Sequence, residues 1–93
     1  TCPKILIICL NRFTNNGNKI NNEIKVSELL QFNKKGYNLY GICNHMGGSS
    51  GGHYISHCKN NNEWYRFNDG LVTRVTNLNL SSASIYCLFY RLN

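Results

Sequence analysis

The 93-residue sequence has little proline, few acidic residues and no long apolar run, and each of these shortages excludes some folds or functions. It has one proline and no linker-like stretch, so we expect one small domain or part of one. No apolar run approaches the ~18 residues of a membrane span, so we expect no transmembrane segment. The chain lacks a basic leader with a small-residue cleavage site and begins at Thr1, so we expect an excised or processed segment.

The sequence also lacks paired cysteine motifs. Its five cysteines stand at irregular spacings and form no Cys-x-x-Cys pair. This pattern argues against a zinc ribbon and gives no support to a disulfide scaffold. We expect reduced thiols in a cytoplasmic or nuclear protein, and we interpret Cys9, Cys43 and Cys87 as small buried residues.

Acidic residues are scarce: four face ten lysines and arginines, for a formal charge of +6. Such a balance permits contact with nucleic acid. The basic residues are scattered, however, and Lys34-Lys35 is the only adjacent pair. Because charge alone indicates only non-specific attraction, we do not expect a nucleic-acid partner.

Helical periodicity is almost absent, and short apolar runs alternate with turn residues. Residues 4–13 predict a strand, the Asn15–Asn18 turn predicts a hairpin, and residues 19–26 are its candidate return strand. Residues 27–30 are a candidate helical turn. Further strands are expected at 37–44, 53–59, 64–68, 71–75 and 85–91, and Met46–Gly52 is too rich in glycine for regular structure. In the strand at 37–44, alternation places Leu39 and Ile42 on opposite faces.

The hairpin of residues 53–59 and 64–68 brings two polar side chains together. If residues 59–62 form its loop, Cys58 pairs with Glu63 and His53 lies directly opposite Asn68, with Cβ atoms ~4.5–5.5 Å apart. An amide oxygen at that distance can accept a hydrogen bond from an imidazole N–H. A general-base histidine needs such a partner to fix its tautomer and leave its other nitrogen free. The alternative is a surface pair at a strand end.

Longer stretches of sequence resemble one known family. Met46–Tyr54 and Trp64–Asp69 resemble the histidine box of the ubiquitin-specific proteases, which are papain-like cysteine deubiquitinases. Residues 3–13, 37–47 and 82–91 resemble the neighbouring strands of that family, in the same order. The resemblance therefore covers nearly the whole chain.

The resemblance implies a fold, a reaction and a site. The fold is α+β and mainly antiparallel, the β-rich half of a papain-like cysteine protease, with residues 1–93 as the C-terminal portion of the catalytic domain. The reaction is thiol-dependent hydrolysis after the C-terminal glycine of ubiquitin, so ubiquitin and ubiquitinated proteins are the expected partners. The implied catalytic residues are His53, Asn68 and Asp69, of which the register favours Asn68 over Asp69. The implied substrate-binding residues are Gly47, Gly48, Gly51, Gly52 and Tyr54.

The nucleophilic cysteine is expected upstream of residues 1–93, in the cysteine-box half of the same domain. Cys58 stands an odd number of positions from His53 and so faces away from it. No cofactor or metal is expected, because His53 and His57, four apart on one strand, stand ~13 Å apart and cannot share an ion. We place His57 on the hairpin surface and His45 at the base of the glycine loop. The alternative function is a non-catalytic ubiquitin-binding or scaffold module.

Overall fold

The computed structural model describes residues 3–11, 23–47 and 52–93. Within these ranges the regular structure consists of strands, without a helix. The strands are β1 (Ile5–Cys9), β2 (Ile24–Lys25), β3 (Leu29–Phe32), β4 (Lys35–Met46), β5 (His53–Asn60), β6 (Glu63–Asn68), β7 (Leu71–Val75), β8 (Ser81–Ser82) and β9 (Ile85–Leu92). The predicted mainly antiparallel structure is confirmed. The described residues include no helix with the length and apolarity needed to cross a membrane.

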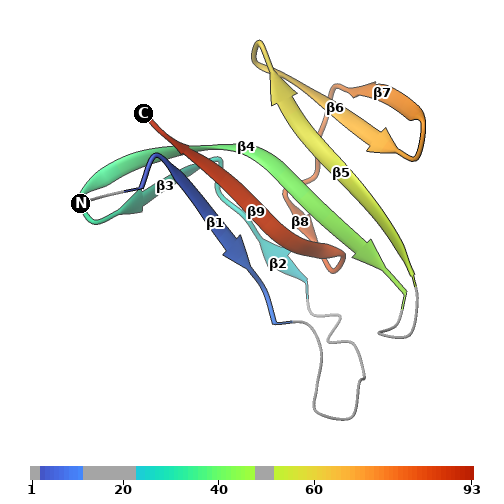
Figure 1. The fold of residues 1–93 in the computed structure, drawn as a ribbon, viewed down its shortest axis with the longest axis horizontal. Coiled ribbons are helices and arrows are strands. Elements are labelled where there is room, and N and C mark those ends of the chain that lie inside the picture. The colour runs from blue at the N-terminus through green and yellow to red at the C-terminus, as the bar shows by residue number, and fades with distance from the viewer. Residues whose placement is uncertain (1–2, 12–22, 48–51) are drawn as a thin grey trace.

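Seven strands form one sheet in the order β1-β9-β4-β5-β6-β7, and β3 pairs with β4. All the pairs are antiparallel. The last strand of the chain, β9, lies between β1 and β4, so the two ends of the sequence share one sheet (Figure 1). The consecutive strands β4, β5, β6 and β7 form a meander. That meander carries the predicted site.

The predicted hairpin is present, but its register was wrong by two residues. The ladder joins Asn60 to Glu63 and Cys58 to Tyr65, so the turn is Asn61-Asn62 rather than a four-residue loop. Both turn residues have positive φ, at 53° and 64°. Asparagine tolerates this conformation, and two-residue turns of this kind match the twist of a hairpin. The β6–β7 turn at Asp69-Gly70 has the predicted position.

Two predictions for the N-terminal third were wrong. Residues 27–30 do not form a helical turn, because Leu29 and Leu30 begin β3, which pairs with β4 through a tight turn at Asn33-Lys34. The described part of the segment 19–26 does not return along β1. Its strand β2 pairs instead with β8, within a segment predicted as loop. The Asn15–Asn18 turn and residues 19–22 lie outside the described residues.

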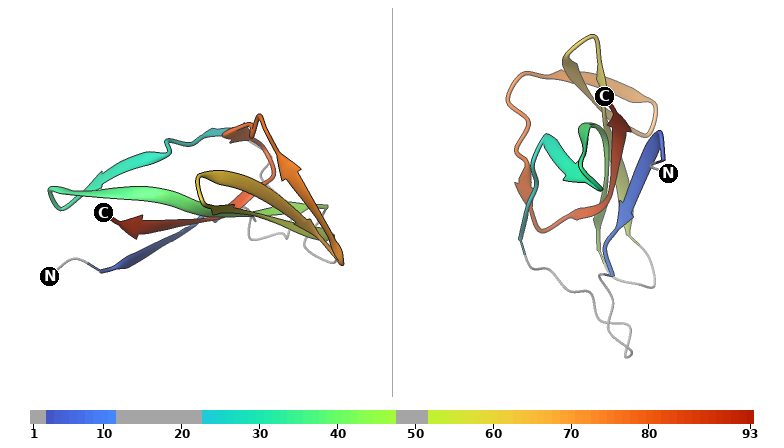
Figure 2. Two further views of the ribbon diagram at one scale, coloured as in Figure 1. Left: turned by 90° about the horizontal axis from the view of Figure 1, so that it is seen from above. Right: turned by 90° about the vertical axis from the view of Figure 1, so that its left-hand side faces the viewer.

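The core lies between one face of the main sheet and the segments that carry β2 and β8, which contribute Ile24, Val26 and Leu80 to it. These segments lie along one side of the sheet (Figure 2). A bulge at Tyr40 adds one residue to β4, so that Leu39 opposes Tyr90 and Ile42 opposes Leu88. The predicted alternation is therefore reversed after Tyr40, and Leu39 and Ile42 share the core face. The buried core residues are Val26, Tyr37, Leu39, Ile42, Trp64, Ile85, Leu88 and Tyr90.

Candidate active site

A histidine and an asparagine meet at one end of the meander, where β5 begins and β6 ends. His53 is the first residue of β5 and Asn68 is the last residue of β6. His53 Nε2 lies 2.6 Å from Asn68 Oδ1, and both side chains are half-buried. Side chains alternate along a strand, so a register shift of two residues keeps Asn68 on the face of His53. It becomes a diagonal neighbour rather than a direct one.

The contact fixes the histidine tautomer. An amide oxygen only accepts hydrogen bonds, so the ring carries its proton on Nε2 and donates it to Asn68 Oδ1. The lone pair of Nδ1 then remains as the basic nitrogen of His53. Asn68 is neutral, so it orients the ring without adding a full negative charge beside it. This pair can therefore act as an oriented general base.

Asp69 does not take the place of Asn68. It lies in the β6–β7 turn with φ at 53°, and it is exposed. The structure thus brings Asn68 to His53 and leaves Asp69 at the turn beside them. The predicted preference for Asn68 agrees with this geometry.

Two glycines near the pair, Gly52 and Gly47, have backbone conformations that favour glycine. Gly52 has φ of 140°, and a Cβ there would lie 2.5 Å from the carbonyl oxygen of Met46 and 2.6 Å from His45 Nε2. Only glycine fits this close approach. Gly47, at the end of β4, has φ of 110°. Gly48 and Gly51 lie outside the described residues.

Tyr54 lies on the opposite face of β5 from His53, because the two are neighbours on a strand. Its ring centroid is 4.6 Å from that of His45, which it opposes on β4, and 6.2 Å from that of Tyr86. His45 is buried, as expected at the base of the loop, while Tyr54 is 55% exposed. His45 therefore supports both residues that flank His53, namely Gly52 and Tyr54.

A polar network near the pair links β6, β5 and β4 through the buried His57 and Asn44, and sequence reasoning missed it. Arg66 Nε donates to His57 Nε2 (3.1 Å), and His57 Nδ1 donates to Asn44 Oδ1 (2.8 Å). Asn44 Nδ2 in turn donates to Ser84 Oγ (3.1 Å). The prediction that His57 lies on the surface was wrong, because β5 is flanked by β4 and β6 and His57 is buried. The available signal was Asn44, an amide that directly follows the apolar pair Ile42-Cys43 within the strand.

The network requires a neutral His57. Its Nε2 accepts from Arg66, so protonation there would remove the acceptor and place two cations together. Burial and, second to it, the Arg66 charge lower the pKa of His57 from its ordinary value. Arg66 and Asn68 stand two apart on β6, on one face. The network therefore ties the strand that carries Asn68 to β5 and β4.

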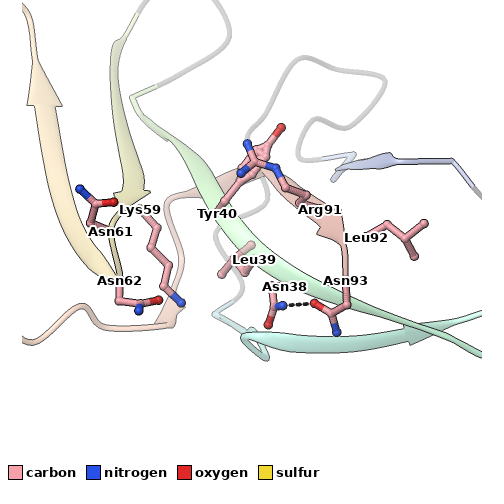
Figure 3. Close-up of a pocket in the computed structure, with 9 residues that line it drawn as sticks. All are labelled: Asn38, Leu39, Tyr40, Lys59, Asn61, Asn62, Arg91, Leu92 and Asn93. Carbon is pink, nitrogen blue, oxygen red and sulfur yellow. Dashed lines mark hydrogen bonds between the residues drawn. The ribbon is translucent and has the colours of Figure 1, made fainter.

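A cavity of about 320 Å³ lies beside Asn68 and above this network, lined in part by Asn44, His57, Arg66, Asn68, Ser82 and Ser84. A larger pocket, of about 430 Å³, lies elsewhere, between β4, β9 and the β5–β6 turn (Figure 3). Lys59 and four asparagines line it, and Arg91 stacks on the ring of Tyr40 at 4.4 Å. Neither His53 nor Asn68 reaches it, so we assign it no part in the candidate active site.

None of the described cysteines is placed to act with His53. Cys58 lies on the other face of β5, as expected. Cys43 opposes Ser56, so it also lies on that other face, and Cys87 opposes Cys43. Cys87 is buried and Cys43 half-buried, but Cys9 is exposed, which corrects the prediction that it is buried. Among the described residues, no group of three or more His, Cys, Asp or Glu side chains could hold a metal ion.

Comparison with known proteins identifies the family to which this chain belongs. The family model for ubiquitin carboxyl-terminal hydrolases matches residues 1–90. The chain is a member of the ubiquitin carboxyl-terminal hydrolase family. That membership confirms the resemblance to the ubiquitin-specific proteases.

Individual relatives agree. The chain is 38% identical to ubiquitin carboxyl-terminal hydrolase 2 of Gallus gallus over 97% of its own length and 29% of the relative. It is 39% identical to ubiquitin carboxyl-terminal hydrolase Usp2 of Drosophila melanogaster over 95% of its length and 11% of the relative. The chain thus spans less than a third of the length of these relatives.

Solved structures confirm the fold. The Ubp8-Sgf11-Sgf73-Sus1 SAGA DUB module contains a chain that matches with a TM-score of 0.87 and 29% identity, over 98% of this chain and 24% of that one. The same module bound to ubiquitin aldehyde matches with a TM-score of 0.82 and 26% identity, over 98% and 25%. These likenesses support the predicted β-rich, papain-like fold class. An essential yeast splicing factor shares the fold at 19% identity and a TM-score of 0.83.

Proposed function

We propose that residues 1–93 are the C-terminal, histidine-bearing portion of a deubiquitinase catalytic domain. The whole enzyme hydrolyses isopeptide or peptide bonds after the C-terminal glycine of ubiquitin. The observation that carries the proposal is the 2.6 Å contact between His53 Nε2 and Asn68 Oδ1 in a chain of this family. Ubiquitin and ubiquitinated proteins are its proposed partners, because a structure in this fold class holds ubiquitin aldehyde.

His53 and Asn68 have distinct roles in this reaction. The Nδ1 atom of His53 takes the proton of a cysteine thiol, and the thiolate attacks the carbonyl carbon of the terminal glycine. His53 then gives that proton to the departing amine, and water attacks the thioester with His53 again as the base. Asn68 keeps the ring in its tautomer throughout, and the hydrogen bond strengthens when the ring becomes charged. Asp69, at the adjoining turn, is the proposed acidic member of the site.

The nucleophile comes from the upstream cysteine-box half of the same domain. The described cysteines of this chain lie on strand faces directed away from His53 or on distant strands. The upstream half must therefore approach the end of the sheet where His53, Met46 and Gly52 lie. Residues 1–93 alone are then inactive.

The substrate tail lies along the glycine loop. A ubiquitin tail ending in glycine needs a narrow passage, and residues without side chains allow its backbone to approach closely. Gly47 and Gly52 stand at the two ends of the loop, next to Met46 and His53, which oppose each other on β4 and β5. We assign Gly48 and Gly51 to the same passage from the sequence. Tyr54 is exposed and follows His53 on β5, but its side chain lies on the other face of the strand, so we propose that it contacts the tail on that face, beside Gly52.

The experiment uses the full-length protein and ubiquitin with a fluorogenic amide at its C-terminal glycine. We expect hydrolysis by the wild type and a loss of more than 100-fold in kcat/KM in His53→Ala, since general-base catalysis contributes ~10²–10⁴-fold. The matched control is Cys58→Ser, an exposed residue of the same strand that faces away from His53. Equal hydrolysis by wild type and His53→Ala would refute the proposal.

A second candidate function is a non-catalytic ubiquitin-binding or scaffold module. The observation that favours it is the shared fold of the yeast splicing factor, which shows that the fold extends beyond proteins described as hydrolases. The two functions differ in one result. A scaffold would bind ubiquitin with unchanged affinity in wild type and His53→Ala, and neither protein would release the fluorophore.

A further inference from the structure

Three thiols lie in a row across three neighbouring strands, from the edge strand β1 inward. Cys9 on β1 opposes Cys87 on β9, and Cys87 opposes Cys43 on β4. These three strands are neighbours in the sheet (Figure 1). Directly opposed residues of antiparallel strands share a face. The Sγ atoms of Cys9 and Cys87 are 3.0 Å apart. Residues 78 positions apart in the sequence thus hold their sulfur atoms in contact.

The strand register permits a covalent bond between the two sulfurs. Opposed Cα atoms of antiparallel strands stand ~4.5–5.5 Å apart. Disulfides span Cα separations of ~4.4–6.8 Å. The bond can therefore form by side-chain movement alone, without a change in the ladder between β1 and β9.

We propose that Cys9 and Cys87 are a modification site at which a peroxide forms a reversible cross-strand disulfide. The thiolate of Cys9 attacks one oxygen of hydrogen peroxide, the O–O bond breaks, and the products are a sulfenic acid and water. The thiolate of Cys87 then attacks the sulfur of Cys9, and the leaving hydroxide takes a proton to become water. Two thiols lose two electrons, and one peroxide gains them.

The environments of the thiols set the order of these steps. Cys9 is exposed and is the thiol that a peroxide in solution reaches. Cys87 is buried, and burial, with the neighbouring Cys9 thiol, raises its pKa to about 12. Cys87 is therefore the resolving residue, which reacts because Cys9 is already in contact with it. Cys43 lies half-buried on the other side of Cys87, and burial raises the pKa of its thiol. It can pair with Cys87 only when Cys9 is absent.

The site is separate from the candidate active site. Cys43 opposes Ser56, which lies on the face of β5 that is opposite to His53. The bond would clip β1, an edge strand, to β9. This proposal does not rest on the proposed function, since no step of it uses His53 or ubiquitin.

The experiment oxidises the full-length protein with graded hydrogen peroxide, removes the excess with catalase and alkylates the remaining thiols. Trypsin then releases residues 5–12 and 75–91, each with a single cysteine, so the linked peptide is unambiguous. We expect this linked peptide to rise at least tenfold and to disappear after dithiothreitol. Cys58, exposed and opposed by Gly41 and Tyr65, is the internal control, and we expect it to form no link.

Two variants make the test decisive. Cys9→Ser changes an exposed residue and should abolish the linked peptide, whereas Cys58→Ser should leave its yield within twofold of the wild type. The proposal is overturned if Cys58 is oxidised while residues 5–12 and 75–91 stay unlinked. It is equally overturned if Cys9 resists alkylation in the untreated protein, or if Cys9 is recovered bound to another cysteine.

Discussion

Replacing Asn68 tests the proposed positioning of the catalytic base. In Asn68→Ala the ring of His53 loses its acceptor at 2.6 Å and is free to change tautomer and orientation. When the ring is charged in the transition state, this bond is charge-assisted and worth ~1.5–3 kcal/mol. We therefore expect kcat/KM of the full-length protein to fall about 10- to 150-fold. KM should change little, because the bond matters most in the transition state.

The assay is hydrolysis of ubiquitin with a fluorogenic C-terminal amide, measured across pH. Asn68→Asp should retain activity, and the acid limb of its profile should move to higher pH, because a carboxylate favours the charged imidazole. Asn60→Ala, at the exposed far end of β5, is the matched control and should stay within twofold of wild type. An Asn68→Ala enzyme within twofold of wild type would refute the role of Asn68.

Three further predictions concern the surroundings of the site. Gly52→Ala places a Cβ 2.5 Å from the carbonyl oxygen of Met46 at a backbone φ of 140°, which costs ~1–3 kcal/mol of strain beside His53. We therefore expect kcat/KM to fall about tenfold or more. The control Gly70→Ala has open space around the new Cβ and should match wild type. Because folding lowers the pKa of His57, its contribution to the free energy of unfolding is present above about pH 6.5 and is lost as pH falls. The free energy of unfolding of His57→Gln, measured with urea, should therefore fall less at low pH than that of the wild type. The same pH dependence in both proteins would contradict the neutral state of His57. Leu39→Ala empties a fully buried position and should lower the free energy of unfolding by ~2–5 kcal/mol, and a cost below ~1 kcal/mol would contradict the assigned core.

The pairing of His53 with Asn68 was predictable because it depends on a period of two. The loop length was wrong, since nothing in Asn60–Asn62 distinguishes a two-residue turn from a four-residue loop. The error of two residues returned every side chain to its predicted face. An error of one residue would have placed Asn68 on the far face. The site was therefore insensitive to the mistake in register.

Other features depended on information that local sequence does not carry. The β3–β4 turn uses Asn33-Lys34, and lysine gives no signal for the positive φ of 64° that it adopts. The β2–β8 pair joins residues far apart in the chain, which no local pattern indicates. The bulge at Tyr40 reverses the alternation of β4 through its pairing with β9. The burial of His57 follows from the same cause, because only the sheet order makes β5 an interior strand.

In the proposed reaction, His53 activates a cysteine upstream of this chain. The most direct measurement adds ubiquitin with a cysteine-reactive C-terminus to the full-length protein, with and without His53→Ala, and maps the labelled residue. We predict one labelled cysteine upstream of residues 1–93, with labelling lost in the variant. Labelling of Cys9, Cys43 or Cys58, or ubiquitin binding without labelling in either protein, would contradict this role of His53.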